Sequence, residues 1–75
     1  MLMNEKTAER YLELALSEVG GVAKMADALG ISPQAVSQWS VAPPGRVLAI
    51  EKATGFVVTR YQLRPDIFGE PLSIA

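Results

Sequence analysis

Residues 29–40 read LGISPQAVSQWS, and this stretch decides how the rest of the chain is interpreted. Ser32 is suited to begin a helix, because its hydroxyl can accept a hydrogen bond from a free N–H of the first turn. Pro33 follows at the first helical position, where the missing N–H of proline costs nothing. Gly30 stands where the preceding helix needs a left-handed residue to end. The stretch therefore predicts one helix ending at Leu29 and another beginning at Pro33.

Apolar residues at helical spacing extend this prediction toward the N-terminus. A first helix is expected from about Asn4, a suitable N-cap, to about Val19, where two glycines end it. A second helix is expected from about Val22 to Leu29. The chain up to the quoted stretch is thus predicted to be helical.

Helices are also predicted beyond the quoted stretch. The third helix is expected to end at Ala42, Pro43 and Pro44, because residues before proline are disfavoured in the helical region. A fourth helix is expected over about residues 45–54. For residues 56–58, which are apolar and partly β-branched, a short strand and an extended connection both stay open.

The last part of the chain contains a helical turn and a tail. Thr59 is expected to cap one further turn through Leu63, which Pro65 breaks, and the rest is expected to be irregular and anchored by Ile67 and Phe68. The predicted fold is all-α, a compact bundle of about five short helices that contains a helix-turn-helix. The whole forms a single domain over residues 1–68 with a C-terminal tail over residues 69–75.

Composition excludes several classes of function. The sequence has 75 residues, of which 49% are apolar, so its small interior leaves apolar surface for a partner, most simply a second copy. It has no Cys and no His, which argues against a metal site, a cofactor and an enzyme and favours a reducing cytoplasm. No apolar run approaches the roughly 20 residues of a membrane span. The residues expected to divide between the core and a dimer contact are Phe56, Val57, Val58, Tyr61 and Ile67.

The charge of the chain is unevenly distributed. The formal net charge is −1, which by itself argues against a nucleic-acid binder. Residues 1–20 carry four acidic and two basic side chains, whereas residues 22–64 carry five basic and two acidic ones. A locally basic middle can therefore meet phosphate while an acidic first helix keeps the opposite side solvated.

Two short helices joined through a glycine, the second capped by Ser-Pro, are the pattern of a helix-turn-helix. In this pattern the helices cross at a small residue, for which Ala26 is suitable. Apolar side chains on both helices must point inward to hold them at a fixed angle. The residues predicted to form this structural core are Met25, Ala26, Leu29, Gly30, Ile31, Val36 and Trp39.

The opposite face of the third helix is polar. With Val36 and Trp39 inward, Gln34, Ser37 and Gln38 fall on the other side. Glutamine presents a donor and an acceptor side by side, which matches the N6/N7 edge of adenine in the major groove. A serine hydroxyl can contact a base or a phosphate. These three residues are predicted to contact DNA bases.

Phosphate contacts are predicted where the second, third and fourth helices begin. Free N–H groups at a helix N-terminus suit phosphate oxygens, because the helix dipole is positive there. A cation at such a position is not favoured by the dipole, so a basic residue there points to an external anion. The predicted phosphate contacts are Gly21, Val22, Lys24, Ser32, Pro33 and Arg46.

Plainer structural explanations stay open for several of these residues. Trp39 could stack on a base, but its place among the inward residues favours the core. Lys24 is equally consistent with a phosphate contact and with an ordinary surface charge. Arg60 and Arg64 are interpreted as structural, with Arg64 as a partner of Glu51.

The stretch GGVAKMADALGISPQAVSQW (residues 20–39) resembles the helix-turn-helix of lambda-repressor/Cro-type regulators. The following VLAIEKATG and VTRYQLRPDIF are similar to the phage-derived Cro-like, YdaS-type group in particular. The resemblance covers roughly residues 19–68 and implies a lambda repressor-like fold that binds operator DNA, usually as a homodimer, in prophage or toxin–antitoxin control. It also implies base contacts at the three polar residues of the third helix and phosphate contacts near Lys24 and Arg46. Val22 departs from the pattern, since many relatives carry there a glutamine that touches phosphate.

The sequence thus predicts a sequence-specific DNA-binding transcriptional regulator, a Cro-like repressor that reads a near-palindromic operator in double-stranded DNA through the major groove. The alternative is an antitoxin-type protein-interaction module whose main partner is a toxin protein. No catalytic residues and no membrane partner are expected. RNA is not favoured as a ligand, because no aromatic stacking platform is apparent.

Overall fold

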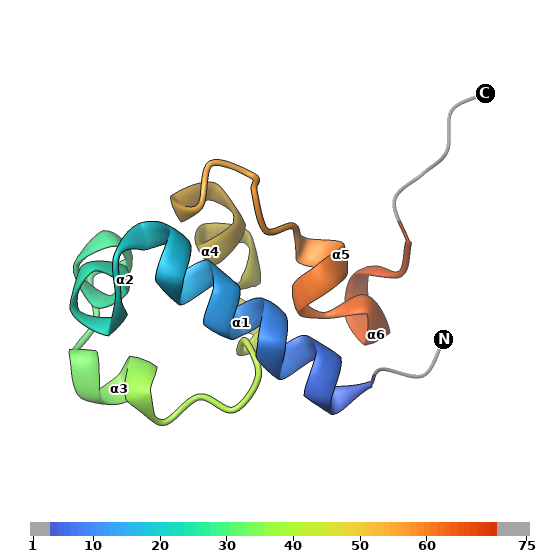
Figure 1. Cartoon of the computed structure of the whole chain (residues 1–75), viewed down its shortest axis with the longest axis horizontal. Coiled ribbons are helices and arrows are strands. Elements are labelled where there is room, and N and C mark those ends of the chain that lie inside the picture. Colours follow the sequence, from blue (N-terminus) through green and yellow to red (C-terminus); the bar gives the residue numbers. More distant parts are fainter. Residues whose placement is uncertain (1–3, 71–75) are drawn as a thin grey trace.

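The computed structural model describes residues 4–70, and every regular element within them is a helix. The elements are α1 (Glu5–Val19), α2 (Val22–Leu29), α3 (Pro33–Ser37), the 3₁₀ helix η1 (Pro44–Arg46), α4 (Val47–Ala53), α5 (Arg60–Leu63) and α6 (Pro65–Phe68) (Figure 1). The prediction of an all-α bundle of short helices is confirmed. None of the helices within residues 4–70 is long and apolar enough to cross a bilayer.

The first helix begins and ends where the sequence indicates. The Asn4 side chain accepts a hydrogen bond from the Thr7 N–H at 3.2 Å, which satisfies one of the free donors of the first turn. Gly20 ends the helix with φ of 102°, a left-handed conformation that glycine adopts without steric cost. Between these ends, Ala8, Leu12 and Ala15 form the buried stripe of α1.

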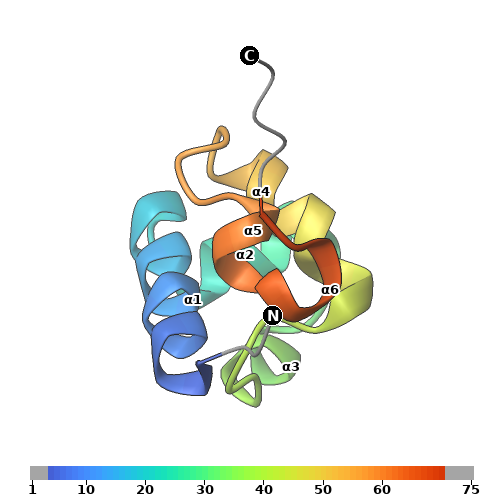
Figure 2. The same ribbon diagram turned by 90° about the vertical axis from the view of Figure 1, so that its right-hand side faces the viewer.

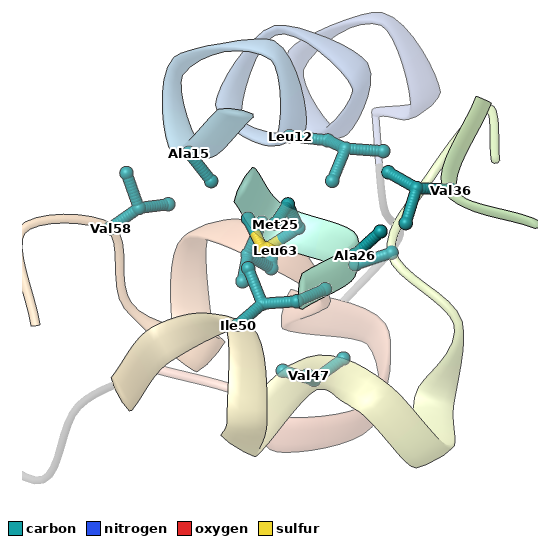
Figure 3. Packing of buried hydrophobic residues seen from close by; sticks show 10 residues of the cluster. Leu12, Ala15, Met25, Ala26, Val36, Val47, Ile50, Val58 and Leu63 are labelled. Carbon is teal, nitrogen blue, oxygen red and sulfur yellow. The ribbon is translucent and has the colours of Figure 1, made fainter. Parts of the chain in front are cut away.

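The other helices pack around this stripe. Figure 2 shows α1 along one side of the molecule, with α3 at the lower edge and α4 at the upper edge. Figure 3 shows side chains from α1, α2 and α4 converging on one interior, where Met25 and Ile50 are fully buried. The buried cluster consists of Leu12, Ala15, Met25, Ala26, Val36, Ala42, Val47, Ile50, Val58 and Leu63. A core of this size leaves each of these residues in contact with several helices.

The third helix is shorter than predicted. It ends at Ser37, and residues 38–43 form an irregular connector that leads to η1 (Figure 1). Ala42 in this connector is fully buried, and the residue before a proline is disfavoured in the helical region. Tertiary burial and the two prolines override the helical tendency of this segment.

The C-terminal part also differs from the prediction. Pro65 does not begin an irregular tail but stands at the first position of α6, where its fixed φ suits a helix. Phe68 packs against the core as expected, whereas Ile67 is 47% exposed and does not anchor the chain. The predicted tail, residues 69–75, lies outside the described residues apart from Gly69 and Glu70.

Residues 56–58, for which a strand and a connection were both open, form a turn and a bend. Val58 is fully buried, but Phe56 and Val57 are 60% and 55% exposed. Thr59 then caps α5 as predicted, since its side chain accepts the Gln62 N–H while the Gln62 side chain accepts the Thr59 N–H. This reciprocal pair is a capping box, which fixes the start of a helix of only four residues.

Candidate nucleic-acid interface

The joint between α2 and α3 has the geometry that its sequence predicts. Gly30 has φ of 70°, and its N–H donates to the Asp27 carbonyl at 3.3 Å. The Ile31 N–H donates to the Ala26 carbonyl at 3.0 Å. These two bonds are the Schellman arrangement, which satisfies the last carbonyls of α2 while the chain turns. The turn between the two helices is therefore fixed by backbone hydrogen bonds.

The start of α3 is likewise confirmed. The Ser32 Oγ accepts the Ala35 N–H at 3.1 Å, and Pro33 is the first residue of the helix. Both side chains are exposed. Because Ser32 uses an oxygen lone pair for the cap, its hydroxyl hydrogen is still available to an external acceptor.

The predicted structural core of the two helices is buried or partly buried apart from Gly30, which is exposed. Met25, Ala26 and Val36 are 0%, 1% and 2% exposed. Partly buried side chains that pack against this core are Leu29, Ile31 and Trp39. Trp39 thus lies on the inner side of the connector rather than on a surface that could stack on a base.

The polar face of α3 points into solvent. Gln34, Ser37 and Gln38 are all exposed, whereas Val36 between them is buried. Gln38 is the C-cap residue rather than part of a longer helix, but its φ of −84° and ψ of −8° keep it close to the helical path. The structure therefore places the three predicted base-contacting residues along one short helix, from its first turn to its C-cap, and all three are exposed.

The predicted phosphate contacts need one correction. The N–H of Gly21 already donates to the Leu16 carbonyl at 2.7 Å as part of the α1 cap, so it is not free for a phosphate. The first backbone bond within α2 runs from the Met25 N–H to the Gly21 carbonyl. The N–H groups of Val22, Ala23 and Lys24 precede it, and these are the donors that a helix start leaves without an intrahelical partner.

The two basic side chains near these positions differ in their surroundings. Lys24 is exposed but folds back over Gly20, since its Cδ lies 2.8 Å from where a Cβ on that glycine would be. Its ammonium is therefore close to the end of α1, where a positive charge is favoured by the helix dipole. Arg46 is exposed at the end of η1. Arg46 is therefore better placed than Lys24 to contact an external anion.

Glu51 and Arg60 form a buried polar cluster at the start of α5, and this pairing was not predicted from the sequence. Glu51, only 3% exposed, accepts the Arg60 N–H at 2.7 Å and two guanidinium N–H groups at 3.1 and 2.9 Å. The predicted pair of Glu51 with Arg64 is wrong. Arg64 instead pairs with Asp66, because the two are adjacent at the start of α6.

The sequence carried a signal for this cluster. Glu51 falls at helical spacing with Val47, Ile50 and Thr54, all of which are buried. A carboxylate on a buried stripe requires a partner. Thr54 completes the cluster, since its hydroxyl lies 2.9 Å from the Glu51 carbonyl and accepts the Val58 N–H at 3.2 Å. No buried side-chain nitrogen or oxygen within the described residues lacks a hydrogen-bond partner.

These pairs shift the acidity of the two carboxyl groups. The hydrogen bonds from the Arg60 side chain hold the pKa of Glu51 below its ordinary value, although burial opposes this. The hydrogen bonds from Arg64 likewise lower the pKa of Asp66. Both groups thus carry their charge within ion pairs of the fold, so neither is available as a general acid.

No group of three or more acidic, His or Cys side chains could hold a metal ion within residues 4–70, and no pocket opens on their surface. The accessible polar groups of α3 and the first turn of α2 are the features suited to a large, flat ligand.

Comparison with known proteins found a family and a relative that match this chain. A family model described as "Bacterial toxin YdaS" matches residues 12–72, a span that takes in the second half of α1 and every later helix. The Escherichia coli (strain K12) protein named "Putative transcriptional regulator YdaS" is 46% identical over 57 residues, covering 71% of this chain. The match covers 58% of that relative, so the chain spans little more than half its length. No solved structure was found to match. The chain belongs to the YdaS family, as the resemblance of its helix-turn-helix and of the segments after it predicted.

Proposed function

We propose that the chain is a sequence-specific DNA-binding regulator of transcription, a Cro-like repressor that reads a near-palindromic operator through the major groove. The observation that carries this proposal is the exposed face of Gln34, Ser37 and Gln38, held outward by the buried Val36. The name of the Escherichia coli relative, a transcriptional regulator, supports the same function.

The chemistry of this face suits base recognition. Each glutamine amide offers a donor and an acceptor that together match the major-groove edge of adenine. α3 is only five residues long, so its base-reading groups all lie within about one and a half turns. A helix of this length places two or three side chains against base edges, which is the usual number for this class of protein.

Phosphate contacts would supply affinity and register. In our proposal the N–H groups of the first turn of α2, from Val22 onward, approach one phosphate, and the Ser32 hydroxyl approaches another. Arg46 and Lys24 contribute charge. Because these contacts carry no sequence information, they explain binding to any duplex, whereas Gln34 and Gln38 explain preference.

A second copy of the chain completes the proposed complex. Two copies related by a twofold axis would place their α3 helices in successive major grooves, roughly 34 Å apart. This spacing predicts a near-palindromic site. We propose no enzymatic activity, because the sequence has neither His nor Cys to serve as a base or nucleophile.

The first test is selection of bound fragments from random duplex DNA. We expect a symmetric motif, and affinity for it that falls as salt rises, because bound phosphates release counterions. Gln34→Ala or Gln38→Ala should then weaken operator binding by about 1–3 kcal/mol while barely changing affinity for random duplex. Equal losses on both duplexes would refute the assignment of these amides to base contacts.

Gln62→Ala is the matched control for these variants. It removes the same amide from the α5 capping box, where the side chain accepts the Thr59 N–H. We expect it to lower the melting temperature without changing the ratio of operator to random-duplex affinity. A change in that ratio would mean that any loss of a glutamine, and not its place on α3, alters recognition.

The second function class that we propose is an antitoxin-type protein-interaction module in toxin–antitoxin control, whereas the family description itself names a bacterial toxin. Phe56 and Val57, both more than half exposed, are apolar side chains that such a contact could bury. This alternative predicts a saturable protein complex that persists in high salt, since apolar burial is screened far less than phosphate contact. Absence of any preferred duplex together with such a complex would favour it over the DNA-binding proposal.

A further inference from the structure

The connector between α3 and η1, residues 38–43, is sparsely held by its own backbone. The N–H groups of Gln38 and Trp39 donate back to the last turn of α3, at 3.3 and 3.1 Å. Within residues 4–70, the hydrogen bond that reaches residues 40–42 is a different one, from the Arg64 Nη1 to the Ala42 carbonyl at 3.0 Å. This bond joins parts of the chain that are 22 residues apart.

Arg64 is held in place for this contact. Its Nε and Nη2 donate to the two carboxylate oxygens of Asp66 at 3.0 and 2.9 Å. A guanidinium is planar, so a bidentate carboxylate on one edge fixes the direction of the remaining N–H groups. The Arg64 side chain is only 14% exposed, and Ala42 is fully buried. The three residues thus form a clamp, Arg64–Asp66–Ala42, between the start of α6 and the connector.

We infer that Arg64 and Asp66 are positioning residues for the C-terminal end of α3, where two of the proposed base-reading residues, Ser37 and Gln38, lie. α3 is five residues long, so its orientation depends on what holds its two ends. The Gly30 turn fixes its start, and the connector fixes its end, where Gln38 lies. Because the Ala42 carbonyl is bonded to a guanidinium that Asp66 holds in place, we infer that the clamp restricts movement of the connector and so of Gln38 and Trp39. The part of this inference that concerns recognition rests on the proposed function, whereas the part that concerns the connector does not.

The chain offers a matched control for this clamp. Arg60 and Glu51 form a second guanidinium–carboxylate pair, with distances of 3.1 and 2.9 Å, and it ties α4 to α5 without reaching the connector. Arg64→Lys and Arg60→Lys each keep the positive charge and lose the planar fork. Any difference between the two variants therefore comes from where the arginine lies in the fold and not from a change in net charge.

The single tryptophan of the chain, Trp39, lies in the connector and packs against the core, which makes its fluorescence a direct probe. We expect Arg64→Lys and Asp66→Asn to increase quenching of Trp39 by acrylamide, at a temperature where circular dichroism shows the same helix content as in the parent. Arg60→Lys should leave the quenching unchanged. If Arg64→Lys quenches like the parent, the clamp does not position the connector and the inference is overturned.

DNA binding gives the second readout. On an operator obtained by selection, Arg64→Lys should lose about five- to tenfold in affinity, while its affinity for random duplex stays near that of the parent. Arg60→Lys should keep the operator preference. Increased quenching with an intact operator preference would overturn the role in recognition. Increased quenching in a protein whose parent prefers no duplex would sustain the clamp and overturn the proposed function, so the two failures are distinguishable.

Discussion

The α2–α3 unit, residues 22–42, and the α4–α5 corner, residues 51–60, are ordered by different forces. In the α4–α5 corner, the carboxylate of Glu51 and the hydroxyl of Thr54 take up backbone and guanidinium donors inside the fold. In the α2–α3 unit, the buried side chains are apolar, and the polar side chains of α3 are exposed. The polar side chains of the corner are used in hydrogen bonds within the fold, whereas those of α3 are exposed to solvent.

This difference separates structural polar residues from candidate ligand-binding ones. A buried carboxylate with several hydrogen bonds has little capacity left for a ligand, since its lone pairs are already occupied. An exposed amide backed by a buried valine has all of its capacity left, and the fold has fixed its position. The basic residues of the chain divide in the same way, because Arg60 and Arg64 are paired and Arg46 is exposed.

The largest loss in the free energy of unfolding is expected when a buried apolar side chain of the α2–α3 unit is truncated. Met25 is fully buried at the centre of the core (Figure 3). Met25→Ala removes this side chain and leaves a cavity, so we expect a loss of about 3 kcal/mol in the free energy of unfolding. Urea denaturation followed by circular dichroism measures it. For a chain of this size, such a loss is a large share of total stability.

Leu48→Ala serves as the comparison for this substitution. Leu48 lies in α4 and is 50% exposed, so its truncation should change the free energy of unfolding by no more than about 0.5 kcal/mol. Similar losses for Leu48→Ala and Met25→Ala would show that Leu48 is covered in solution, for instance by a second copy. Repeating the melt at several protein concentrations identifies that case.

A smaller loss in the free energy of unfolding is expected when the hydrogen bonds between Glu51 and Arg60 in the α4–α5 corner are broken. Glu51→Gln keeps the shape of the side chain but places an amide N–H against the guanidinium of Arg60. We expect a loss of about 2 kcal/mol at neutral pH, in the range for hydrogen bonds to charged groups. A variant as stable as the parent would mean that α5 is held by its capping box alone.

The same substitution should change how stability depends on pH. The folded pKa of Glu51 lies below its ordinary value of 4.5, so the folded state binds its proton less readily than the unfolded state. The stabilisation is therefore fully present above pH 4.5 and is lost as pH falls through the folded pKa. Thermal melts between pH 7 and pH 3 should show a shallower decline for Glu51→Gln than for the parent, and a still shallower one when Asp66→Asn is added.

The α2–α3 unit was largely predictable from sequence, because its determinants are local. The cap at Ser32, the turn at Gly30 and the inward position of Val36 each depend on residues within one or two helical turns. The exposure of the α3 amides follows from the same periodicity. Local chemistry therefore predicted which side of α3 is exposed.

What escaped prediction depends on contacts between distant parts of the chain. The connector after α3 buries Ala42 and bonds its carbonyl to Arg64, 22 residues away, and the partner of Glu51 lies nine residues away across a turn. Neither distance follows from helical spacing. The occupied N–H of Gly21 was missed for a related reason, since the α1 cap extends one residue beyond the left-handed Gly20.

The smallest change in the free energy of unfolding is expected at the exposed tip of the α4–α5 corner, and here it is a gain. Phe56 has φ of 66°, a left-handed conformation that disfavours a bulky residue by about 1 kcal/mol. Asparagine tolerates this conformation, and the Phe56 N–H bond to the Glu51 carbonyl, at 3.0 Å, is made by the backbone and is retained. Because the side chain is 60% exposed, little burial is lost, and Phe56→Asn should raise the free energy of unfolding by about 0.5 kcal/mol. If polar groups alone order the corner, this gain is independent of protein concentration. A loss of stability that grows with concentration would instead show that Phe56 is buried between two copies of the chain, and that the strained backbone is maintained by that contact.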